Sequence, residues 1–221
     1  MNKQNTILAT AAILLLFTCA HRAARAQSGE TQKFEVAAQF STLSIDQGFG
    51  TRTEPGVGGR FTYNLTDNLA LEAEGNFFPD NDSFSFRTGG RAVEGLFGVK
   101  IGKRYKRFGF FGKARPGFIS FSRGVTEVIP TGVTTDPFGA FDFRTRHLTH
   151  FALDVGGVVE FYPSRRIFTR IDIGDTIMRF GQTTITTFSG LIGGPFTAVL
   201  FSLPGDTTHN FQFSAGVGFR F

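Results

Sequence analysis

The feature that most constrains the fold is an alternation of apolar and polar residues that recurs along the chain. In residues 211–221, Phe, Phe, Ala, Val, Phe and Phe alternate with Gln, Ser, Gly, Gly and Arg. Successive side chains of a β-strand point to opposite faces, so this period predicts strands with one apolar and one polar face. Eight segments show it: 34–41, 57–64, 69–77, 93–101, 108–118, 151–161, 167–174 and 211–221.

The charged residues of these segments all fall on one face. A charge that faces lipid costs about 2–4 kcal/mol at the bilayer midplane, and an apolar exterior around a polar interior is typical of a transmembrane β-barrel. We therefore predict an all-β fold, an eight-stranded antiparallel up-and-down transmembrane β-barrel. The charges expected in its lumen are Glu35, Arg60, Glu72, Glu74, Glu94, Lys100, Lys113, Arg115, Asp154, Glu160, Arg170, Asp172 and Arg220.

The start of the chain is typical of a secretory signal peptide. A polar start carrying Lys3 precedes an apolar stretch, residues 7–20, which is too short to span a bilayer comfortably. Ala24 and Ala26 then form a small-x-small cleavage site. We predict a cleaved signal over residues 1–26 and a barrel domain over 27–221, a retained anchoring helix being the alternative. The single cysteine, Cys19, lies in the signal, so we expect no disulfide; Thr18 before it disfavours lipidation.

The composition of the chain limits which classes of partner are expected. The net charge of +5 falls to +2 without the signal, because residues 1–26 contain three bases and no acid, and nucleic acid is therefore not an expected partner. No run of 18 apolar residues follows the signal, which excludes a transmembrane helix. The chain still contains 29 Phe, which fits a lipid-facing surface. We expect localisation in the outer membrane and contact with its lipids.

The connections between the segments alternate in length. Residues 65–68, 102–107 and 162–166 are short, whereas 42–56, 78–92, 119–150 and 175–210 are long, as expected for periplasmic turns and outer loops. Aromatic rings with a polar tip favour the membrane interface, so the tyrosines beside the short turns are predicted interface aromatics. These are Tyr63, Tyr105 and Tyr162. Pro116 cannot donate to a ladder, and we expect a bulge or frayed pairing there.

With a signal, eight alternating segments and the final Phe219-Arg220-Phe221, the chain resembles the small outer-membrane β-barrel family. This is the porin-like group typified by the OmpA transmembrane domain and OmpX. The resemblance covers nearly the whole exported chain. It implies that Val217, Phe219 and Phe221 form a signal read by the barrel-assembly machinery. The family includes adhesins, anchors, small channels and a few lipid enzymes, so the resemblance does not decide the activity.

The lumen charges are nearly balanced, with seven acids and six bases. The interior of an eight-stranded barrel is just wide enough for side chains, and an unpaired buried charge is costly. We therefore predict a salt-bridged polar plug; a narrow conducting path formed by the same residues is the alternative.

Catalytic and metal-binding patterns are weak. Glu72 and Glu74 share a face and could act as an acid/base pair, but neutralisation by neighbouring bases is favoured. His147, His150 and His209 lie near the outer mouth and are interpreted as solvated loop residues rather than a metal site. The residues after His147 and His150 depart from the His and Ser pattern of barrel lipid deacylases. We expect no catalytic residue, cofactor or metal, and hence no enzyme.

The two longest connections are the remaining candidates for function. Residues 175–210 have an apolar content unusual for a solvated loop, which is explained by a hairpin that continues the strands (the favoured reading), a cap over the mouth or a binding surface. We predict a monomer with a structural, adhesive or surface-interaction role, contacting an extracellular ligand or surface through 119–150 and 175–210. The alternatives are a small passive channel and, less favoured, a lipid-modifying enzyme.

Overall fold

The computed structural model describes residues 32–46, 50–80, 85–130, 141–189 and 197–221, so the predicted signal lies outside the described residues. None of the described residues forms a helix long and apolar enough to cross a membrane. The strands are β1 (Phe34–Asp46), β2 (Thr51–Asn64), β3 (Leu69–Phe78), β4 (Ala92–Arg104), β5 (Phe108–Pro130), β6 (Phe141–Phe161), β7 (Ile167–Phe180), β8 (Thr183–Ser189), β9 (Thr197–Leu203) and β10 (Asp206–Arg220).

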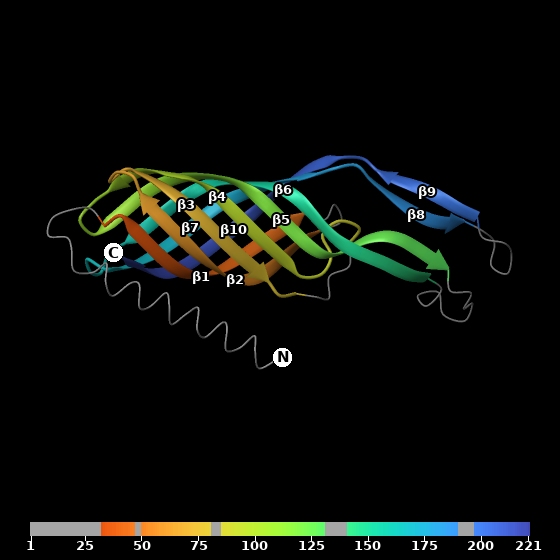
Figure 1. Cartoon of the computed structure of the whole chain (residues 1–221), viewed down its shortest axis with the longest axis horizontal. Coiled ribbons are helices and arrows are strands. Elements are labelled where there is room, and N and C mark those ends of the chain that lie inside the picture. Colours follow the sequence, from red (N-terminus) through yellow and green to blue (C-terminus); the bar gives the residue numbers. More distant parts are fainter. Residues whose placement is uncertain (1–31, 47–49, 81–84, 131–140, 190–196) are drawn as a thin grey trace, which may run out of the picture.

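Eight of these strands form a closed ring. Each strand from β1 to β6 pairs antiparallel with the next, β7 pairs with β10, and β10 returns to β1. The β1–β10 ladder closes the ring and pairs Val36 with Phe219. The predicted eight-stranded up-and-down barrel is confirmed. The C-terminus lies at the end of the barrel opposite the β8–β9 hairpin (Figure 1).

The two faces of the wall differ as the alternation predicts. Outward side chains within the barrel are apolar and exposed, such as Phe97 at 59%, Ile101 at 60% and Val217 at 55%. The inward side chains of the same strands are polar and buried. Lipid covers the apolar exterior in a membrane, so the chain stabilises the fold by pairing polar groups inside rather than by an apolar centre.

The strands run much further than predicted at the end opposite the short turns. A membrane strand needs about 9–11 residues, whereas β5 has 23 and β6 has 21. The prediction that 119–150 is a loop is therefore wrong for 119–130 and 141–150, which are strand. Strand also replaces parts of the predicted connections 42–56 and 175–210.

These extensions were missed because the two faces exchange their polarity. Leu43 and Ile45 of β1 are completely buried inside the ring, while Thr42 and Ser44 point outward. Ser44 also shares a hydrogen bond of 2.9 Å with Thr53 on β2. The period of two continues, but an apolar residue now points inward, as in a soluble barrel surrounded by water.

The favoured prediction that residues 175–210 continue the strands as a hairpin is confirmed. β7 and β10 extend beyond the barrel and β8 and β9 form an antiparallel hairpin between them. This hairpin projects far from the barrel, beside the extension of β5 and β6 (Figure 1). A parallel bridge between Glu127 and Thr186 joins the two, next to two register shifts in the β5–β6 ladder.

Pro116 interrupts one ladder, as expected. It pairs with Leu153 on β6. On its other side, the β4–β5 ladder has a gap between the pairs Leu96↔Gly117 and Val99↔Ala114. The register is the same on both sides of this gap, so the irregularity is frayed pairing rather than a bulge.

Candidate functional site

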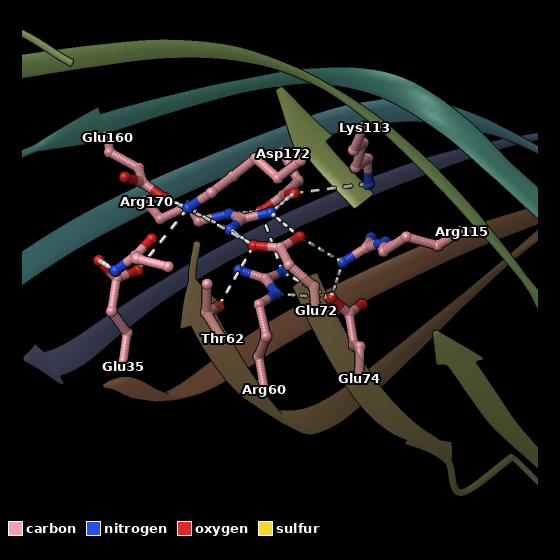
Figure 2. Close-up of polar contacts among 12 residues, drawn as sticks. Glu35, Arg60, Thr62, Glu72, Glu74, Lys113, Arg115, Glu160, Arg170 and Asp172 are labelled. Carbon is pink, nitrogen blue, oxygen red and sulfur yellow. Dashed lines mark hydrogen bonds and ion pairs between the residues drawn. The ribbon is translucent and has the colours of Figure 1, made fainter. Parts of the chain in front are cut away.

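The barrel interior contains a network of ion pairs. All thirteen side chains predicted to face the lumen are buried, with exposed fractions of 8% or less. Figure 2 shows how charged side chains from several strands converge near Glu72. Arg170 of β7 contacts both oxygens of Glu72, one of them at 3.0 Å, and donates to the two oxygens of Asp172 at 2.7 and 2.8 Å. The centre of the lumen is therefore filled by paired charges.

Further pairs link neighbouring strands and also strands that face each other across the lumen. Arg60 of β2 lies 2.7 Å from Glu74 and 3.1 Å from Asp172 across the lumen. Arg115 of β5 contacts Glu74 and lies 2.6 Å from Asp154. The side chains of Glu72 and Glu74 are thus held by arginines, an arrangement that favours neutralised ion pairs over an acid/base pair.

At the end with the short turns, one cation had escaped the sequence analysis. Arg104 lies 2.9 Å from Glu35 and donates to the Tyr162 hydroxyl at 2.9 Å. It belongs to the same face as Lys100, so extending the alternation by four residues finds it. With Arg104 included, the described network has seven acids and seven bases.

Tyr162 was predicted to lie at the membrane interface, and this is wrong. It is 7% exposed, donates to Glu160 at 2.6 Å and lies under the Arg220 guanidinium, 4.6 Å from its ring centroid. The reason is the strand period, which places Tyr162 on the same inward face as Glu160. Tyr105 is 53% exposed, and Tyr63 packs against Phe34 with ring centroids 5.2 Å apart; their interface role stays a prediction.

Above the ion pairs lies a layer of amides and hydroxyls. Asn76 donates to Glu94 at 2.7 Å and Gln212 donates to the same oxygen at 2.9 Å. Ser41 and Ser214 share a hydrogen bond of 2.8 Å. Among the described residues Glu94 forms no ion pair, so amides rather than cations satisfy it. The charge pattern of the sequence does not identify these neutral side chains.

A compact apolar layer lies at the outer end of the lumen. Its members are 4% exposed or less and come from six strands: Leu43, Ile45, Phe78, Ala92, Leu96, Ile119, Phe121, Ala152, Met178 and Phe180. The prediction that His150 is a solvated loop residue is wrong, because it is 8% exposed and its ring lies 4.6 Å from that of Phe180. Its Nε2 lies 3.4 Å from the carbonyl oxygen of Arg87, in the segment after β3.

His147 and His209 lie outside this layer. His147 is exposed, and His209 lies 2.5 Å from Asp175 on the outer wall. Within the described ranges, no three His, Cys, Asp or Glu side chains are grouped to hold a metal ion.

The hairpin of β8 and β9 offers a second candidate site. Val199, Leu200 and Phe201 of β9 are 43%, 72% and 53% exposed. In the part of the chain that the structure describes, β9 pairs with β8 on one side and has no strand on the other. Its backbone edge is open and its apolar side chains face water.

A family model described as "Outer membrane protein beta-barrel domain" matches residues 10–221. The chain belongs to this family. The resemblance drawn from the sequence is therefore confirmed, and the protein is an outer-membrane β-barrel. No curated protein matches the sequence.

The chain is similar to several solved structures at low sequence identity. Neisserial surface protein A is 13% identical with a TM-score of 0.53, over 85% of this chain and 97% of that one. Ail of Yersinia pestis, solved with the heparin analogue sucrose octasulfate, is 10% identical with a TM-score of 0.48, over 86% and 100%. The N-terminal barrel of Pseudomonas aeruginosa OprF is 13% identical with a TM-score of 0.46, over 87% and 100%.

Proposed function

We propose that the protein is a closed, non-catalytic barrel that holds a contact surface away from the outer membrane. The observation that carries the proposal is the β8–β9 hairpin, whose edge strand exposes Val199, Leu200 and Phe201. Soluble proteins usually protect such an edge with charges or a covering element, because open apolar strands pair with other chains. The seven residues of β9 contain neither a charge nor a proline.

The barrel supplies a rigid base for this surface. Val125 of β5 and Ile185 of β8 are fully buried close to the bridge between Glu127 and Thr186. The hairpin is thus packed against a strand that continues from the membrane. A partner that adds a strand to β9, or covers its apolar side chains, fits this arrangement.

The same proposal assigns the interior a structural role. Balanced ion pairs fill the middle of the lumen, and the apolar layer around Phe121 and Met178 closes its outer end. Apolar constrictions oppose the passage of water and ions, so this layer supports a closed interior over a channel. The proposal also holds that residues 1–26 are removed on export, that the assembly machinery reads Val217, Phe219 and Phe221, and that the protein acts as a monomer.

Adhesion of cells that display the protein tests the contact surface. We expect the double variant Leu200→Lys/Phe201→Lys to lose most of the adhesion to protein-coated surfaces, because charges on the edge strand oppose pairing. Thr145→Lys, on the exposed part of β6, is the matched control and should adhere like the unmodified protein. Undiminished adhesion of the double variant would contradict the proposal.

Conductance in a planar bilayer tests the closed lumen separately. We expect no stable open steps from folded protein. Discrete steps that change when Lys113 or Glu94 is neutralised would establish the alternative, a small channel formed by the lumen residues.

A further inference from the structure

The turns at the C-terminal end of the barrel form a basic rim. We define it by the exposed residues Lys103, Lys106, Arg107, Arg165 and Arg166. Lys103 lies near the end of β4, and the other four belong to the turns that follow β4 and β6. These turns are in contact, since the backbone N–H of Tyr162 donates to the carbonyl of Arg107 at 2.9 Å. Among the described residues of the three short turns, Asp67 is the acidic one, and it lies in the remaining turn, 65–68.

The rim lies directly against the lipid-facing surface. Phe108, which follows Arg107, is 47% exposed, and Ile167, which follows Arg166, is 44% exposed. A strand rises about 3.3 Å per residue, so the cations lie within a few ångströms of the edge of the apolar band. This is the depth of the lipid headgroups on the side of the short turns.

An apolar groove begins beside the same arginines. It has a volume of about 360 Å³ and crosses β1, β10 and β7 on the outside of the barrel; its lining is Val36, Ala37, Ala38, Ile167, Val217, Gly218 and Phe219. The small side chain of Ala38, which points outward, leaves the hollow between larger neighbours. The backbone N–H of Arg220 donates to the Arg166 carbonyl at 2.7 Å, which ties the turn to the strand that forms the groove floor.

We infer that the groove and the basic rim form one binding site for an anionic phospholipid. An acyl chain fills the groove, and the headgroup phosphate lies against Arg165 and Arg166. Arginine binds phosphate with two parallel hydrogen bonds. A zwitterionic headgroup offers the same phosphate but carries no net negative charge. A free anion would need the arginines alone, whereas the adjoining apolar hollow fits the chain of a lipid.

Native mass spectrometry of the protein purified from membranes tests this site, with equal amounts of phosphatidylglycerol and phosphatidylcholine added. Unmodified protein should retain phosphatidylglycerol in preference to phosphatidylcholine. Each cation near a headgroup layer contributes about a fivefold preference, so Arg165→Gln/Arg166→Gln should reduce phosphatidylglycerol retention about 25-fold. Retention of phosphatidylcholine by this variant should not change.

Two further variants separate the parts of the site. Ala38→Phe fills the groove with an apolar side chain and should reduce retention of both lipids. Arg144→Gln/Arg146→Gln removes two cations from the exposed part of β6 and should leave retention unchanged. The mobility of unheated samples on a gel verifies that each variant is folded.

Three results would overturn the inference. The first is equal retention of both lipids by the unmodified protein. The second is an equal loss in the Arg144 and Arg146 control, which would show a general charge effect. The third is displacement of bound lipid by inorganic phosphate with full retention in Ala38→Phe, which would show a bare anion site.

Discussion

Replacing Arg170 with Met tests whether the lumen is a dry, paired interior. Arg170 is 2% exposed and contacts the carboxylates of Glu72 and Asp172. Removing one member of a buried ion pair costs about 3–5 kcal/mol, because a charge is left buried without its partner. Glu72 keeps Lys100 at 3.5 Å and Asp172 keeps Arg60 at 3.1 Å. We therefore expect the lower end, a loss of about 3 kcal/mol in the free energy of unfolding.

Urea unfolding in phospholipid vesicles, followed by gel mobility, measures this loss. Arg144→Met is the matched control, because its pair with Glu127 spans 3.0 Å but its side chain is 69% exposed; exposed pairs contribute about 0.2–1 kcal/mol. Adding Glu72→Gln to Arg170→Met should recover part of the loss, since it removes one of the orphaned charges. A loss for Arg170→Met as small as that of the control would refute the reasoning, and would indicate that water screens the lumen charges.

Two further changes probe the wall. Ile171→Arg, at a lipid-facing site that is 47% exposed, should cost about 2–4 kcal/mol near the midplane and lower the inserted fraction in a vesicle-folding assay. Gly98→Ala should destabilise by about 1–3 kcal/mol because its Cβ would lie 2.1 Å from the Ala114 carbonyl oxygen. Gly157→Ala, whose Cβ would meet nothing within 4 Å, should change stability by less than about 1 kcal/mol in the same urea assay.

The sequence predicts the membrane-embedded part of the barrel well because one physical rule governs it. Lipid excludes charge from the outer face, so residues such as Glu72 and Arg170 must point inward wherever the alternation holds. This rule does not predict which charged side chains form ion pairs with one another. Arg60 reaches Asp172 across the lumen, and such a contact depends on the tilt and stagger of the closed ring, which a pattern within one strand does not contain.

The part outside the membrane was predicted less well, for the converse reason. Leu43, Ile45 and Met178 point inward, which breaks the assumption that apolar residues face outward. The interface prediction for Tyr162 was wrong because its position beside a turn was given more weight than its place in the strand alternation. The prediction that His150 is solvated was wrong because the residue was assigned to a loop. It lies on β6, three residues beyond the exposed His147.

The exchange of faces has a consequence for the outer surface. On β1 the outer face becomes polar where Leu43 and Ile45 point inward, and these two residues belong to the apolar layer around Phe121 and Phe180. This layer fixes β5 and β7 just before they leave the ring. β5 then continues without a break to Pro130 and bears the β8–β9 hairpin through the bridge at Glu127. The layer that closes the lumen therefore also anchors the proposed contact surface, so substitutions that loosen it should impair adhesion before they abolish membrane insertion.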